Sequence, residues 1–317
     1  MEFMPELNIY GTFGPSCHAR EDLEKLLDAG ATGMRLNLSH GSLKDHEDWI
    51  KAYHEAGGKD LLIDMKGPEL RVGKDLEPLQ LVEDEAVYVE RLMLPQVVLD
   101  VLEEDKTLLL DDGKIELKME SPNVAVVVQG GLLMPSKSVA VPGFKSPYPA
   151  LTEEDHENLL NAKEFGVTGI MQPFVRSKED LIEVREALKR YGLENVRLFA
   201  KIESAEGLQQ LEQLLPFCDE VIIARGDLAN AVGITNIAKI QNDIEDVCRA
   251  HQKPWMVVTQ MLDSMRFSPA PTRAEITDIY NAVKAGASSI MLTGETASGK
   301  YPILAMETFV AAAKTAQ

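Results

Sequence analysis

Short apolar runs alternate with amphipathic segments along most of the chain. Residues 8–13 form a first apolar run, and residues 19–30 follow with a helical period that ends on glycine, as many helices do. The same two patterns recur in turn almost to the last residue. This alternation is typical of a parallel sheet that is covered by helices.

Eight such pairs occur outside one interruption. The predicted strands are residues 8–13, 32–39, 59–67, 167–173, 196–203, 219–227, 253–260 and 288–295. The predicted helices are residues 19–30, 44–57, 152–166, 177–192, 205–217, 234–252, 272–286 and 301–316. Eight strand and helix pairs of this size predict an α/β fold of the (β/α)₈ TIM-barrel type.

The interruption covers residues 72–143, where the helical period gives way to short apolar runs such as residues 86–90 and 123–131. Between two further runs, the segment Asp-Asp-Gly-Lys at residues 111–114 is typical of a tight hairpin turn. We therefore predict a small all-β domain inserted after the third strand. The barrel then consists of residues 1–71 and 144–317.

Composition narrows the possible functions. The 317 residues carry a formal net charge of −19, which excludes the basic face needed for non-specific nucleic-acid binding. Cys17, Cys218 and Cys248 are few and far apart, so neither a disulfide framework nor a zinc site is indicated. The N-terminus lacks a basic region, and no apolar run is long enough to span a membrane. We expect a soluble cytoplasmic protein.

Charged and polar residues gather where the predicted strands end. Lys201 and Glu203 close the fifth strand, and Arg225, Gly226 and Asp227 close the sixth. Polar residues at the other strand ends are Arg35, Asn37, Ser39, Asp64, Lys66, Arg71, Thr259, Thr293 and Glu295. Because the carboxyl ends of barrel strands share one face, these residues predict a cationic cleft with embedded acids.

Such a cleft is suited to a phosphorylated, carboxylated small molecule held through a divalent metal. Glu203 and Asp227 supply the hard oxygens that Mg²⁺ prefers. The backbone N–H groups of residues 225–227 are expected to open a helical turn that receives a carboxylate.

Residues 294–301 carry one misleading motif. The segment GETASGKY fits G-x-x-x-x-G-K, but Tyr301 stands where a P-loop has Ser or Thr. We therefore do not predict a P-loop.

Nearly the whole chain resembles pyruvate kinase. The motifs are GTFGPS, MRLNLSHG, DMKGPELRVG, LLLDDGKIEL, KIESAEG, IIARGDL, VVTQMLDSM, PAPTRAEITDIYNAV and IMLTGETASGKYP, in the family's order and spacing. The resemblance implies glycolytic phosphoryl transfer from phosphoenolpyruvate to ADP, giving pyruvate and ATP. It also implies Mg²⁺ or Mn²⁺ and K⁺ as cofactors, an inserted domain that closes over the site as a lid, and a possible homo-oligomer.

Site roles follow from the resemblance by matching motifs. Glu203 and Asp227 match the Mg²⁺ ligands, and Lys201 matches the lysine that stabilises the transferring phosphoryl group and the enolate. Arg35 is similar to the family's phosphate-binding arginine, with Arg71 beside it.

The remaining substrate positions are also implied by the resemblance. Arg225, Gly226 and Asp227 match substrate-binding positions, and so does Thr259, which lies near the face where enolpyruvate is protonated. Thr293 replaces a serine that is linked to proton delivery, and it keeps the hydroxyl.

A K⁺ site is implied at Asn37, Ser39, Asp64 and the carbonyl of Met65. Glu69 is the residue type of K⁺-dependent members of the family.

Three residues are implied to lie near the nucleotide. His40 and Pro15 match positions in the barrel, and Lys137 resembles a lysine of the closing domain.

The sequence departs from the family in three places. Residues 229–233 are Ala-Asn-Ala-Val-Gly where the family has Gly-Val-Glu-Ile-Pro, so the loop after the sixth strand is expected to differ. The insert at residues 72–143 is short, so it is expected to close less completely and to bind nucleotide more weakly. The family's C-terminal effector domain has no counterpart here, so activation by that route is not expected.

Two alternatives stay open. One is a catalytically weak sensor that binds phosphoenolpyruvate. The other is a metal-dependent lyase or aldolase that stabilises pyruvate enolate without ADP. The retained Asp111, Asp112 and Lys137 of the insert argue against the lyase.

Other residues that might suggest a binding site have simpler explanations. We expect surface positions for His18, His46, His54, His156 and His251, which lack metal-ligand spacing. Trp49 and Trp255 are expected to pack against the core, because neither lies in a basic, aromatic-rich stretch.

Overall fold

The computed structural model describes residues 7–111, 113–144 and 147–317. Its chain forms two compact units, one of Met1–Gly67 with Ala150–Gln317 and one of Pro68–Pro149. Each unit has its own hydrophobic core. The two units are therefore described separately.

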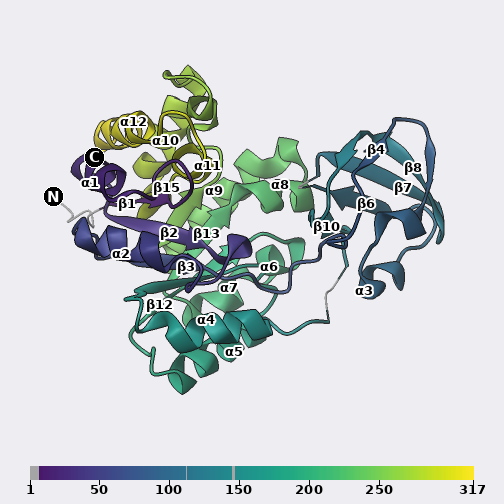
Figure 1. Cartoon of the computed structure of the whole chain (residues 1–317), viewed down its shortest axis with the longest axis horizontal. Coiled ribbons are helices and arrows are strands. Elements are labelled where there is room, and N and C mark those ends of the chain that lie inside the picture. Colours follow the sequence, from purple (N-terminus) through teal and green to yellow (C-terminus); the bar gives the residue numbers. More distant parts are fainter. Residues whose placement is uncertain (1–6, 112, 145–146) are drawn as a thin grey trace. The chain divides into compact units, whose positions relative to one another are not determined.

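The first unit contains a closed barrel of eight parallel strands, which confirms the predicted fold class (Figure 1). Around the barrel the strands follow the order β1, β15, β14, β13, β12, β11, β3, β2. Their bounds are β1 Asn8–Thr12, β2 Gly33–Asn37, β3 Leu61–Asp64, β11 Gly169–Gln172, β12 Arg197–Ile202, β13 Glu220–Ala224, β14 Trp255–Val258 and β15 Ser289–Met291.

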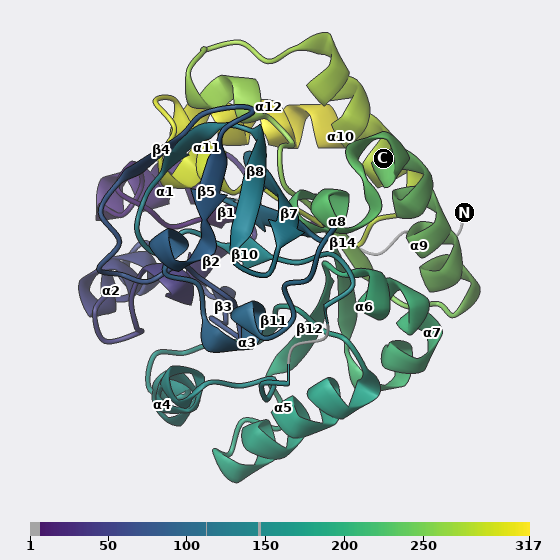
Figure 2. The ribbon, with the colours of Figure 1, turned by 90° about the vertical axis from the view of Figure 1, so that its right-hand side faces the viewer.

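Helices surround the barrel strands as an outer ring (Figure 2). The α-helices are α1 Arg20–Asp28, α2 Glu47–Glu55, α4 Glu153–Ala162, α5 Lys178–Arg190, α6 Ala205–Gln209, α7 Leu211–Leu214, α8 Arg225–Val232, α9 Ile237–Ala250, α10 Arg273–Ala285, α11 Gly294–Ala297 and α12 Pro302–Lys314. Short 3₁₀ turns are η1 Leu38–His40, η3 Leu215–Phe217, η4 Ile234–Asn236 and η5 Asp263–Arg266.

Two predicted elements differ from the structure. The helix predicted over residues 205–217 is divided into α6, α7 and η3. The strand predicted over residues 219–227 ends at Ala224, because the chain turns into α8 at Arg225. The charged residues that follow β13 are therefore helical.

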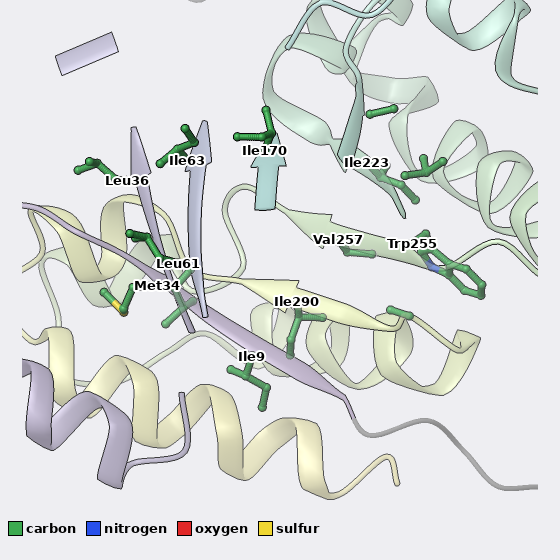
Figure 3. Packing of buried hydrophobic residues seen from close by; sticks show 14 of the residues in the cluster. Ile9, Met34, Leu36, Leu61, Ile63, Ile170, Ile223, Trp255, Val257 and Ile290 are labelled. Carbon is green, nitrogen blue, oxygen red and sulfur yellow. The ribbon is translucent and has the colours of Figure 1, made fainter. Parts of the chain in front are cut away.

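Side chains of the barrel strands alternate between two cores, as the period of a strand requires. Met34 and Leu36 of β2, with Leu61 and Ile63 of β3, point outward to the helices (Figure 3). Leu62, Phe199, Ile222 and Met256 are among the residues that fill the barrel interior instead. This alternation fixes which strand residues can reach the site.

The second unit is built from antiparallel strands, as expected for the insert. A five-stranded sheet has the order β10, β6, β7, β8, β5, and β4 pairs with β9. Their bounds are β4 Leu79–Leu81, β5 Ala86–Tyr88, β6 Thr107–Leu110, β7 Ile115–Ser121, β8 Val124–Gln129, β9 Gly131–Leu133 and β10 Val139–Ala140, with η2 Val89–Leu92 and α3 Gln96–Leu99 between them.

The predicted hairpin joins β6 to β7, where Leu110 pairs with Ile115. Asp111 and Gly113 have positive φ angles of 50° and 76°, which a tight turn requires. Asp112, which the sequence analysis also placed in this turn, lies outside the described residues.

At the start of α4, Thr152 and Asp155 form a capping box. Asp155 is fully buried, and its carboxylate also accepts hydrogen bonds from the backbone N–H groups of Lys66 and Gly67, at 2.8 and 3.0 Å. One side chain thus starts α4 and holds the loop after β3.

Within the part of the chain that the structure describes, every helix is too short or too polar to cross a membrane.

Candidate active site

A charged cluster lies at the carboxyl end of the barrel. Asp64, the last residue of β3, is 2% exposed and accepts from Nη2 and Nε of Arg35 at 2.5 and 3.1 Å. The Nζ atom of Lys201 lies 3.3 Å from both carboxylate oxygens of Asp64. Three strands, β2, β3 and β12, thus bring two cations to one buried carboxylate.

Glu203 joins this cluster from the first position after the end of β12. Its Oε1 lies 2.8 Å from Nζ of Lys201, and its Oε2 accepts from the backbone N–H of Phe174 at 2.8 Å. Phe174 follows β11 and has a φ of 53°, which is uncommon for a residue with a side chain. Phe174, in the left-handed conformation, thus donates its backbone N–H to Glu203, the predicted Mg²⁺ ligand.

The electrostatics of the cluster favour its charged form. Burial by itself would raise the pKa of Asp64, but the neighbouring Lys201 and Arg35 lower that pKa below its ordinary value. Burial would lower the pKa of Lys201, but the carboxylates of Asp64 and Glu203 raise it above its ordinary value. Lys201 therefore remains an ammonium ion across the physiological pH range.

Arg225 is held by side-chain and backbone groups of the protein. Its Nη1 donates to both carboxylate oxygens of Asp278 on α10, at 2.9 and 2.7 Å. Its Nη2 donates to the carbonyl of Thr259 at 2.6 Å and to Sδ of Met261, and its Nε lies 3.2 Å from the carbonyls of Val258 and Thr259. The guanidinium group is thus held in place by the protein, and its contact with the substrate stays a prediction.

Thr259 follows β14 and has a φ of 78°. This conformation is strained for a β-branched residue, and such strain is concentrated at functional sites. A Cβ atom at Gly226 would lie 3.4 Å from the Cγ2 methyl of Thr259, so the start of α8 lies directly against this threonine. The structure therefore brings together the predicted substrate residues Gly226 and Thr259.

Asp227 lies in the first turn of α8, which follows β13, the neighbour of β12 in the barrel. Glu203 and Asp227 therefore come from adjacent strand ends, as the sequence predicted. Residues 225–227 also form the N-terminal turn of this helix, where backbone N–H groups are available to an anion.

Thr293 lies at the end of the eighth strand of the barrel. Its hydroxyl donates to Oε2 of Glu295 at 3.2 Å, and its backbone N–H donates to the same oxygen at 2.8 Å. The other oxygen of Glu295 accepts from the backbone N–H of Leu262. Glu295 is 1% exposed, so a buried carboxylate orients the hydroxyl that the sequence analysis linked to proton delivery.

The predicted K⁺ ligands lie at or just after the ends of two adjacent strands. Asn37 on β2 pairs in register with Asp64 on β3, and Met65 follows directly. The Oδ1 atom of Asn37 accepts from the backbone N–H of Ser39 at 3.2 Å and so shapes the turn that carries this serine. All four residues offer hard oxygen atoms, which alkali and alkaline-earth cations prefer.

The candidate nucleotide residues of the first unit are exposed. Pro15 lies in the loop after β1, and His40 ends the short turn η1 after β2. Because β1 and β2 are paired, the two loops leave neighbouring positions of the barrel.

The other candidates belong to the second unit, where they form a cluster of their own. Arg71 donates to Oε2 of Glu69 and to the carbonyl of Ser136, and the backbone N–H of Val72 donates to the carbonyl of Lys137. Lys137 pairs with Asp111 at 2.7 Å.

The donor set at the barrel end fits a Mg²⁺ ion. Each oxygen of Glu203 has one hydrogen-bond donor, so lone pairs remain for a cation. Among the residues that the structure describes, no group of three His, Cys, Asp or Glu side chains is arranged to hold a metal. Two carboxylates would therefore leave the remaining positions to water and substrate oxygens, as Mg²⁺ commonly does.

Sequence reasoning missed several supporting residues. Phe174 and Asp278 carry no sequence pattern that marks them, because their roles arise from a backbone N–H and from an ion pair across 53 residues. The sequence analysis did place Glu295 at a strand end, but it did not predict the hydrogen bonds of Glu295 to Thr293 and Leu262. The prediction for His46 was wrong, because this side chain is 9% exposed and packs on Trp49.

Comparison with known proteins identifies relatives of the chain. The family model described as pyruvate kinase, barrel domain, matches residues 4–306. The pyruvate kinase of Bacillus licheniformis is 36% identical over 327 aligned residues, which cover 96% of this chain and 56% of that protein.

In two further relatives, the alignment with this chain covers a larger share of the relative. The pyruvate kinase of Aeropyrum pernix is 35% identical, with 95% of this chain and 69% of that protein aligned. The pyruvate kinase of Clostridium perfringens is 32% identical, with 99% and 71% aligned. The chain thus spans about half to two thirds of the length of these relatives.

Proposed function

The chain belongs to the pyruvate kinase family, and from this premise we propose that it transfers a phosphoryl group from phosphoenolpyruvate to ADP. The bond from phosphorus to the enol oxygen breaks, and a bond from phosphorus to a terminal oxygen of ADP forms. The enolate that remains takes a proton at carbon and becomes pyruvate. Family membership gives the reaction class, and the charged cluster gives its candidate residues.

The observation that carries the proposal is the buried group of Lys201, Arg35, Asp64 and Glu203. Phosphoryl transfer asks the protein for positioning and for cations around a dispersed negative charge. Lys201 and Arg35 are already held in place by Asp64, so little reorganisation is needed when an anion binds. Lys201 stabilises the transferring group and Arg35 binds the phosphate.

Glu203 and Asp227 would hold Mg²⁺, which would neutralise developing charge on the phosphate and enolate oxygens. The N–H groups at the start of α8, with Gly226, receive the substrate carboxylate. Thr259 and Thr293 line the route of the proton, with the hydroxyl of Thr293 oriented by Glu295.

The proposal includes K⁺ at Asn37, Ser39, Asp64 and the Met65 carbonyl, where one further positive charge would assist phosphate binding. Activity should rise strongly when K⁺ replaces a bulky organic cation, and Glu69→Lys should reduce that dependence. Initial rates in matched chloride salts measure this effect. A cation response that Glu69→Lys leaves unchanged would remove Glu69 from the proposal.

For the nucleotide, we propose that Pro15 and His40 of the first unit contact ADP. His40→Ala should then raise the KM for ADP with little effect on the KM for phosphoenolpyruvate.

The experiment that tests the proposed function is pyruvate formation from phosphoenolpyruvate, Mg²⁺ and K⁺, with and without ADP, coupled to lactate dehydrogenase. Pyruvate that depends on ADP supports the kinase. Phosphoenolpyruvate binding without turnover would favour the sensor, and release of pyruvate from a different carbon substrate without ADP would favour the lyase.

A further inference from the structure

Three aromatic rings pack together where the loops after β1 and β2 meet. His18 belongs to the first loop, His46 ends the second, and Trp49 lies in the first turn of α2. The ring of His18 stacks on Trp49 at a centroid distance of 4.9 Å and an interplanar angle of 27°. The ring of His46 meets Trp49 edge-on, at 4.5 Å and 69°. We call His18, Trp49 and His46 the aromatic bracket.

Each histidine of the bracket is also tied to one of the two loops. Nδ1 of His18 donates to the carbonyl of Pro15 at 3.2 Å, and Nδ1 of His46 donates to the carbonyl of Ser42 at 3.0 Å. Because a carbonyl only accepts hydrogen bonds, both rings carry their proton on Nδ1. The bracket therefore connects the two loops through two hydrogen bonds and one shared indole.

The turn after η1 packs directly against the bracket. A Cβ atom at Gly41 would lie only 2.6 Å from Cε1 of His46, and the φ of Gly41 is 138°. Only glycine fits this position without displacing the ring. The backbone next to His40 is thus set by contact with His46.

We propose that the aromatic bracket positions the two exposed loop residues, Pro15 and His40, for the nucleotide. This inference rests on the proposed function, in which these residues contact ADP. The bracket makes Trp49 a positioning residue for ADP, because its indole joins the two histidines that anchor the loops.

The effect of the bracket should be confined to ADP, because other contacts hold the cations proposed to bind phosphoenolpyruvate. Arg35 and Lys201 are fixed by ion pairs to Asp64 and by the hydrogen bonds of the strands. These contacts do not involve the bracket. Loss of the indole should therefore displace the loops without moving Arg35 or Lys201. Because Ser39 of the loop after β2 is a proposed K⁺ ligand, binding is measured without K⁺.

The chain offers a matched control in its second tryptophan. Trp255 starts β14 and packs between the barrel and the helices (Figure 3). Its indole Nε1 has no hydrogen-bond partner among the described residues, and Arg249 lies over its ring at 5.8 Å, so its replacement removes ring volume and this cation–π contact. Trp49→Leu and Trp49→Phe are compared with Trp255→Leu and Trp255→Phe.

Calorimetry on the full chain with Mg²⁺ measures binding of ADP and, separately, of phosphoenolpyruvate. We expect Trp49→Leu to raise the Kd for ADP about tenfold and to leave the Kd for phosphoenolpyruvate unchanged. Trp49→Phe keeps an aromatic ring between the histidines and should recover part of the loss. Both Trp255 variants should bind ADP as the native chain does.

The inference is overturned if Trp49→Leu binds ADP normally or weakens both ligands equally, or if the native chain does not bind ADP. Pyruvate formation by the native chain tests the proposed function separately. Turnover together with normal ADP binding by Trp49→Leu would refute only the bracket. ADP binding that depends on Trp49 without turnover would refute only the kinase. If Trp49→Leu fails to fold, the Kd values of Trp49→Phe for ADP and for phosphoenolpyruvate decide the question in its place.

Discussion

The two ends of the barrel carry similar charges on the same strands but arrange them differently. Asp60 precedes β3 and Asp64 ends it, while Arg197 starts β12 and Lys201 lies near its end. At the amino end, Asp60 accepts from Nη2 of Arg197 at 2.6 and 2.7 Å, from the hydroxyl of Tyr10 at 2.7 Å, and from the hydroxyl of Thr168. Each of these hydrogen bonds to the Asp60 carboxylate comes from a side chain.

The carboxyl end differs from the amino end in its backbone as well as in the arrangement of its charges. Phe174 and Thr259 adopt left-handed conformations directly after their strands, and each directs a backbone group into the charged cluster or its support. Strain of this kind persists where surrounding contacts enforce it. Under the proposed function, similar charges on the same strands serve stability at one end of the barrel and ligand binding at the other.

The largest effect is expected from Glu203→Ala or Asp227→Ala. Loss of either proposed metal ligand should lower Mg²⁺-dependent kcat by at least about 10²–10³-fold, because charge in the transition state loses its compensation. Steady-state assays with circular dichroism measure turnover and folding together. Retained turnover in both folded variants would show that this end of the barrel is not the active site.

At the amino end, Asp60→Asn should lower the free energy of unfolding by about 1–3 kcal/mol, because charge-assisted hydrogen bonds to Arg197 are lost. Its kcat should equal that of the native chain. Urea unfolding and steady-state kinetics test the two expectations. A loss of kcat at unchanged stability would erase the distinction between the two ends.

A smaller effect is expected from Asp278→Asn, which removes the charged partner of Arg225 and loosens its grip on the Thr259 carbonyl. The kcat/KM for phosphoenolpyruvate should fall about tenfold. Asp219→Asn is the matched control, because Asp219 precedes β13 and pairs with Arg185 at 2.8 Å. Equal losses in both variants would indicate a general effect on folding.

The smallest effect concerns Glu220 at the start of β13. Burial raises the pKa of this carboxyl, although the hydroxyls of Ser289 and Ser288 partly lower it. A raised pKa in the folded state favours folding at low pH and loses that contribution as pH rises through it. Glu220→Gln keeps the acceptor for Ser288 and removes the charge.

As pH rises above about 4, the native chain should therefore lose free energy of unfolding relative to Glu220→Gln, because only the native chain carries this titrating carboxyl. Urea unfolding between pH 4 and pH 8 compares the two proteins. Parallel pH profiles would contradict the role given to this buried carboxyl.

Sequence pattern alone determined the barrel, its insert and the end at which the site lies. Periods of two and 3.6 residues identify elements, and parallel connections place all strand ends on one face. Lys201, Glu203, Arg35 and Asp64 were found for this reason, since each lies at or near the end of a strand.

Tertiary structure decided which of these residues face one another. Arg225 looked like a ligand for an anion, but Asp278 and the Thr259 carbonyl engage it. Phe174 contributes through its backbone N–H, and backbone donors leave no mark on residue identity. Partners separated by tens of residues are chosen by packing, so their geometry is set only when the barrel closes.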